Sequence, residues 1–192
     1  MIGKKNVVFG FLFLALSAIL GPVMIVKYIP DVQATATAKQ EKIGFLQQAA
    51  ESGFEVDLEP MDAKTLAQAN TKAVLALSAD LNSQSAMDMI KGGPHAHGNL
   101  EALLNIVVGI FLGFVAAKRL FKQIISWMFI IGTLMHAGLL YASRALGQGW
   151  ADSIMFSPVG PVGPALIVLG LVLCGVIAIT GFRGEPVRDK LM

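Results

Sequence analysis

The residues best suited to chemistry lie in one short stretch, GGPHAHGNLEALLN, at positions 92–105. It contains His95 and His97, two of the three histidines of the chain, followed by Asn99, Glu101 and Asn105. An apolar run follows directly. Polar groups inside a bilayer are unfavourable unless they are paired or hydrated. A helix that carries such residues into a membrane therefore indicates a binding site or a contact with other helices.

Helical spacing places several of these residues on one face. Counting by fours from His97 gives Glu101, Asn105, Gly109 and Gly113, which share one stripe of a helix. Polar residues in a membrane face protein or water, and glycines four residues apart allow close helix contact. We expect this stripe to face the interior of a helix bundle, with Gly109 and Gly113 touching a neighbouring helix.

The third histidine, His136, lies inside the apolar sequence WMFIIGTLMHAGLLYASR. In an antiparallel pair of helices joined by a tight link at 117–122, residue counting places His97 further out than His136. The expected offset is about six residues, or ~9 Å at about 1.5 Å per residue. A buried imidazole at this depth needs a hydrogen-bond partner, and we expect either a backbone carbonyl or Glu101 to provide it.

Imidazole binds iron, copper and zinc, so these residues lead to two chemical hypotheses. In the first, the chain binds haem b near the outer face, with His97 and His136 as axial ligands and His95 as a substitute for His97. Glu101 would then orient a ring nitrogen, as would Asn99, and Arg144 would pair with a haem propionate.

In the second hypothesis, a copper or zinc ion is bound by His95, His97, His136 and Glu101. Two histidines separated by one residue point in very different directions on a regular helix. This alternative therefore requires residues 94–98 to be extended, which Gly92, Gly93, Pro94 and Gly98 allow.

The segment HAHGN at 95–99 looks like the histidine-rich helix openings of haem-carrying membrane proteins. These proteins are related to the large subunits of haem-copper oxidases and nitric oxide reductases, including the NnrS-like group. The resemblance covers about 20 of the 192 residues, and the further histidine motifs of those proteins are missing. It implies a haem ligand at His95 or His97, without an oxygen- or nitric-oxide-reducing centre.

Composition places the chain in a membrane. Of its 192 residues 55% are hydrophobic and 15% are charged, whereas about a quarter are charged in soluble domains. A membrane-spanning helix needs about 20 apolar residues. The runs 6–28, 100–117, 121–142 and 163–182 predict an all-α integral membrane protein with four transmembrane helices. The first run is longer than the about 7–15 residues of a signal-peptide core, so we expect it to remain as a helix.

Positively charged residues predict the orientation, because lysine and arginine favour the cytoplasmic side. They flank the first run, fill the link between the second and third, and follow the fourth; these are Lys4, Lys5, Lys118, Arg119, Lys122, Arg183, Arg188 and Lys190. We therefore expect both termini on the cytoplasmic side of the inner membrane. The expected divisions are a first helix at 1–29, an extracytoplasmic segment at 30–98, a three-helix region at 99–183 and a cytoplasmic tail at 184–192.

The extracytoplasmic segment has the composition of a small helical cap. One helix is expected at 33–52, and a second begins after Asp62, whose carboxylate suits an N-cap. Its expected apolar face consists of Leu66, Ala69, Ala73, Leu77 and Leu81. The prolines of SPVGPVGP at 157–164 predict an extended or turning approach to the last helix.

These features leave several functional classes open. One is a haem- or metal-bearing subunit that transfers electrons within a complex or to quinone, and another is a structural subunit of a larger membrane complex or homo-oligomer. A proton-relaying transporter is a further alternative, and whether the chain is an enzyme stays open. The single cysteine, Cys174, excludes an intrachain disulfide and a CxxCH haem attachment, and the net charge of +2 gives no indication of nucleic acid.

Overall fold

The computed structural model describes residues 2–56 and 59–187 as a helical chain with one two-residue strand pair. Arg188 and Lys190, expected in the cytoplasmic tail, lie outside this range. The α-helices are α1 (Lys4–Ala18), α2 (Leu20–Lys27), α3 (Ile29–Glu51), α4 (Ala63–Ile90), α5 (Ala96–Phe111), α6 (Arg119–Thr133), α7 (Gly149–Met155) and α8 (Val162–Gly181). The strands are β1 (Glu55–Val56) and β2 (Glu59–Pro60), and three π-helical turns are η1 (Lys91–His95), η2 (Leu134–Gly138) and η3 (Tyr141–Ala145).

Three helical stretches within the described residues are long and apolar enough to cross a membrane. They are Lys4–Lys27, Arg119–Ala145 and Val162–Gly181, which match three of the four expected runs. The run 100–117 differs, because α5 ends at Phe111 and the chain then turns, with Gly113 and Phe114 donating to carbonyl oxygens three residues back. The helical class and the apolar spans are therefore confirmed, and the expected fourth span is not among them.

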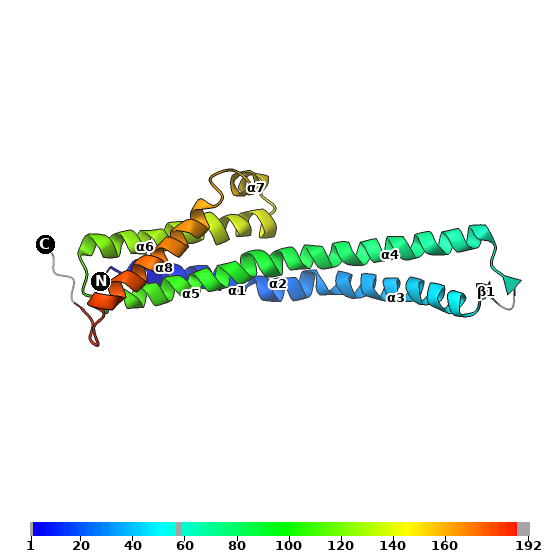
Figure 1. Ribbon diagram of the computed structural model, residues 1–192, viewed down its shortest axis with the longest axis horizontal. Coiled ribbons are helices and arrows are strands. Elements are labelled where there is room, and N and C mark those ends of the chain that lie inside the picture. The colour runs from blue at the N-terminus through cyan, green and yellow to red at the C-terminus, as the bar shows by residue number, and fades with distance from the viewer. Residues whose placement is uncertain (1, 57–58, 188–192) are drawn as a thin grey trace. The chain divides into compact units, whose positions relative to one another are not determined.

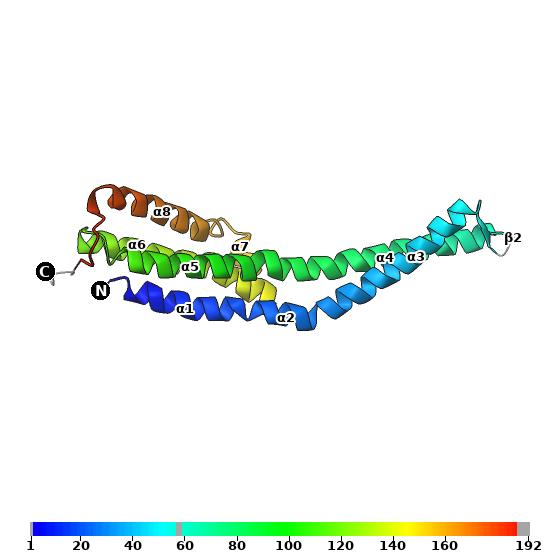
Figure 2. The ribbon, with the colours of Figure 1, turned by 90° about the horizontal axis from the view of Figure 1, so that it is seen from below.

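The chain divides into two compact units, one formed by the residues up to Gly21 together with those from Ile90 onward, and the other by Pro22–Met89. In the first unit α1 lies along α5 (Figures 1 and 2). The two backbones come into direct contact at glycine positions, where no side chain keeps them apart. A Cβ on Gly109 would lie 2.6 Å from the Gly3 carbonyl oxygen, and one on Gly10 would lie 2.7 Å from the Ala102 carbonyl oxygen. Gly109 thus makes the expected helix contact, whereas Gly113 lies beyond the helix end.

A second close contact joins α6 to α8, which crosses it obliquely (Figure 1). A Cβ on Gly163 would lie 2.8 Å from the backbone nitrogen of His136, and one on Gly170 would lie 2.7 Å from the Phe129 ring. Phe129 is fully buried in the core of this unit, together with Val108, Leu112, Ile125 and Ile167. Small residues therefore set both helix contacts of the unit.

In the second unit, α3 and α4 run antiparallel and are joined through the β1–β2 strand pair. The hydroxyls of Thr35 and Ser83 hydrogen-bond at 2.7 Å, and Lys39 Nζ lies 2.5 Å from Asp80 Oδ2. The Lys39 ammonium holds the pKa of the buried Asp80 carboxyl below its usual range. Asp62 Oδ1 accepts a hydrogen bond from the Thr65 backbone at 2.6 Å, which confirms the expected N-cap.

Two expectations in these helices were wrong. Leu77 and Leu81 are 40% and 57% exposed, whereas Ala73 is buried, so the expected apolar face of α4 is covered only in part. Lys122 is buried within α6 rather than placed in a link. The turning approach to the last helix is confirmed, because turns precede Val162, where α8 begins.

We expect Gly109→Ala to lower the thermal stability of the purified protein. The added Cβ meets the Gly3 backbone, which has no flexible end to move aside, and overpacking of this kind costs about 1–3 kcal/mol. Gly175 on α8 has no neighbouring atom within 4 Å, so Gly175→Ala is the matched control. It should be neutral or gain the helix propensity of alanine, up to about 1 kcal/mol. Equal melting temperatures for the two variants would contradict the packing.

Candidate functional site

The candidate site is formed by His97 and Glu101 on α5 and His136 in η2. His136 Nδ1 hydrogen-bonds to Glu101 Oε1 at 2.5 Å. The Glu101 side chain is only 5% exposed and that of His136 is 25% exposed. The His97 ring contacts the His136 ring edge to face, with 4.8 Å between the centroids. The structure thus brings together three of the residues that the sequence singled out as candidate ligands.

The donor atoms of this cluster could share one ion after small side-chain adjustments. One donor atom from each residue lies within 4.8 Å of the other two. Ligands around a zinc-sized ion lie about 2.0–2.2 Å from it, so pairs of donors are separated by roughly 3–4 Å. The second oxygen of Glu101, Oε2, is buried and has no hydrogen-bond partner in the described part of the chain.

Local helix geometry explains why these side chains meet. His97 and Glu101 are four residues apart on α5 and therefore lie on one face. The expected ~9 Å offset between His97 and His136 was wrong. Residues 112–118 do not continue α5 as a helix. The helical distance from the link to His97 is therefore shorter than the residue count assumed, which removes the expected offset. His136 lies in a π-helical turn, a feature that is frequent at functional sites.

His95 points away from this cluster. Its Nδ1 donates to the Ser17 carbonyl oxygen at 3.1 Å and also lies 3.4 Å from Asn99 Nδ2. Residues 94–98 are helical rather than extended, and the kink is at Gly93, with φ −89° and ψ −108°. The condition for His95 and His97 to bind one ion is therefore not met.

Arg144 forms an ion pair that sequence reasoning missed. Its Nη2 lies 3.4 Å from Asp152 Oδ1, and Ser143 Oγ donates to the same oxygen at 2.7 Å. Asp152 belongs to the short helix α7 that follows η3. The arginine thus has a carboxylate partner within the chain.

A layer of buried hydrogen bonds lies one helical turn from the cluster. Asn105 Nδ2 donates to Thr133 Oγ1 at 2.9 Å and to the Glu101 carbonyl oxygen at 3.0 Å, and its Oδ1 accepts from Asn6 Nδ2 at 3.1 Å. Asn6 Nδ2 also donates to the Ser126 carbonyl oxygen, while Ser126 Oγ donates to Asn6 Oδ1. The layer joins α1, α5 and α6. The sequence analysis singled out Asn105 but not Asn6, Ser126 or Thr133. Each of these three is a polar residue within an apolar run, and that pattern was the signal that could have identified them.

Comparison of the chain with protein family models, with curated proteins and with solved structures finds no match. The candidate site therefore has to be interpreted from its own geometry.

Asn6 and Asn105 should be coupled in stability. Asn6→Ala or Asn105→Ala alone leaves its partner buried without one hydrogen bond, at a cost of about 1–3 kcal/mol. The double variant removes both groups, so its loss should be smaller than the sum of the two single losses. A double-mutant cycle of thermal unfolding in detergent measures the coupling. Strict additivity would contradict the observed contact.

Proposed function

We propose that this chain is an integral membrane protein that binds one copper or zinc ion through His97, Glu101 and His136. The observation that carries the proposal is the convergence of these three donors from two helices, with one Glu101 oxygen buried and unpartnered. Two imidazoles and a carboxylate form a donor set typical of first-row transition metals. Three protein ligands also leave a coordination position open for water or a further ligand.

The buried carboxylate supports this proposal. Glu101 is 4% exposed, and its hydrogen bond to His136 engages only one of its two oxygens. An unsatisfied polar group in an apolar interior is costly. A divalent ion would occupy the free oxygen and bring the His97 ring into the same coordination sphere. Without an ion, one oxygen of the Glu101 carboxylate is hydrogen-bonded to His136 and the other has no partner among the described residues.

The same geometry favours a compact ion over haem b. Axial histidines bind haem from opposite faces of the porphyrin, which separates their rings by the thickness of the cofactor. The rings of His97 and His136 are in edge-to-face contact, and Glu101 is hydrogen-bonded to the His136 ring. Haem binding between them would require both contacts to open. A small ion needs only side-chain adjustments.

We further propose that α5 crosses the membrane as a fourth segment, with both termini cytoplasmic and residues 30–98 outside. Its contact with α1 and the burial of Glu101 and Asn105 support a position within the bundle. The lysine and arginine distribution supports the orientation.

Cysteine labelling in intact cells tests this topology. In a Cys174→Ser background, a cysteine at the exposed Gln48 of α3 should react with a membrane-impermeant maleimide added from outside. A cysteine at Lys118, in the link between α5 and α6, should react only after the membrane is permeabilised. The reverse pattern would contradict the orientation.

The metal site is tested by metal analysis of protein purified from membranes. We expect about one copper or zinc ion per chain, because the described part of the chain brings one set of three donors together. His97→Ala, His136→Ala and Glu101→Gln should each reduce the metal content to background or weaken binding by at least tenfold, since two donors bind much less tightly than three.

His95→Ala is the matched control, because the His95 ring bonds to the Ser17 backbone instead of facing the cluster. It should keep the full metal content. An absorption spectrum recorded on the same samples distinguishes the alternatives. A Soret band lost in His136→Ala would replace the ion with haem, and a colourless, metal-free protein would leave a structural role for the cluster.

A further inference from the structure

The α3–α4 unit contains a cleft that belongs to neither the metal cluster nor the helix contacts. Its volume is about 310 Å³, and it is lined by Glu41, Lys42, Phe45, Thr65, Gln68, Ala69 and Lys72. Small-molecule sites in proteins begin at about 300 Å³. The cleft therefore has room for a small ligand of one or two rings.

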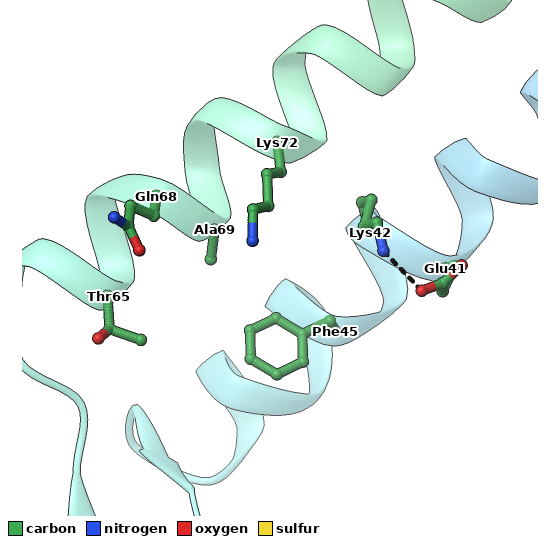
Figure 3. Close-up of a pocket in the computed structure, with 7 residues that line it drawn as sticks. All are labelled: Glu41, Lys42, Phe45, Thr65, Gln68, Ala69 and Lys72. Atoms are coloured by element: carbon green, nitrogen blue, oxygen red, sulfur yellow. Dashed lines mark hydrogen bonds and ion pairs between the residues drawn. The ribbon is translucent and has the colours of Figure 1, made fainter.

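The two helices contribute different chemistry to this cleft (Figure 3). Phe45 extends from α3 toward Ala69, and its side chain is 43% exposed. Lys72 extends from α4 toward α3, while the polar ends of Gln68 and Thr65 lie on the α4 side. A half-exposed aromatic ring thus lies beside a cation, an amide and a hydroxyl.

The charges of the cleft do not cancel. Lys42 Nζ lies 2.6 Å from Glu41 Oε1, so this lysine already has a partner. Lys72 has no ion pair among the described residues. Lys64 adds a second positive charge nearby, because it lines a neighbouring hollow that shares Gln68 and Lys72. The free charge is therefore positive and centred on Lys72.

We infer that this cleft binds a small aromatic carboxylate. The ring of the ligand would stack on Phe45, where offset aromatic pairs are favourable. The carboxylate would accept charge-assisted hydrogen bonds from Lys72 and neutral ones from Gln68 and Thr65. An uncharged aromatic compound would lack the partner for Lys72, and a carboxylate without a ring would leave Phe45 uncovered. This site is independent of the proposed metal cluster.

Titration calorimetry of 2-naphthoate into the full chain in lipid nanodiscs tests the inference. A two-ring ligand of this size should bind with a dissociation constant on the order of 0.1 mM. Phe45→Ala and Lys72→Gln should each weaken binding about tenfold, by removing the stacking surface and the charged donor. Lys64→Gln is the matched lysine comparison and should weaken binding much less than Lys72→Gln, because Lys64 lies beside the cleft without lining it.

The neutral analogue 2-naphthylmethanol distinguishes the site from general partitioning into lipid. It should show no saturable binding to the native chain. Equal heats for naphthoate and its alcohol, or unchanged affinity in both Phe45→Ala and Lys72→Gln, would overturn the inference. Both variants alter exposed or half-buried side chains, and circular dichroism checks that the helices are retained.

Discussion

The close approach of α1 and α5 is the contact on which the rest of the first unit depends. Gly3, Gly10 and Gly109 provide no side chain at this contact, so the two backbones meet directly. Asparagine side chains are short, and only this separation lets Asn6 reach both Asn105 and the Ser126 carbonyl oxygen. In a bilayer these amides have no water as an alternative partner. Glycine packing and the buried hydrogen bonds therefore stabilise each other.

The same register positions the candidate metal ligands. Asn105 donates to the Glu101 carbonyl oxygen one turn earlier on α5 and to Thr133, which lies one turn before His136 on the facing helix. Hydrogen bonds between α5 and α6 thus fix the helices directly beside the cluster. His97, Glu101 and His136 then meet without a long loop or a mobile segment. Such support from neighbouring groups is what holds metal ligands in place in other proteins.

Periodicity in the sequence predicted the parts of the structure that depend on one helix at a time. The apolar stretches of α1–α2, α6 and α8, the stripe from His97 to Gly109 and the Asp62 N-cap are of this kind.

The predictions that were wrong concern relations between helices. The end of α5 at Phe111 removed the expected offset between His97 and His136, and helix continuation through 94–98 turned His95 toward Ser17. Helix counting also could not tell how far along α4 the expected apolar face would be covered, so Leu77 and Leu81 are exposed although they share a stripe with the buried Ala73. The partners of Asn105 required knowledge of how α1 and α6 are placed around α5.

The central claim is that one metal ion is bound jointly by two imidazoles and one carboxylate within this chain. X-ray absorption spectroscopy at the edge of the bound metal measures this coordination most directly. Joint coordination by these residues predicts a shell of nitrogen and oxygen ligands at about 2.0–2.1 Å, with outer-shell scattering from two imidazoles. Scattering from sulfur, from four porphyrin nitrogens or from no imidazole would contradict it.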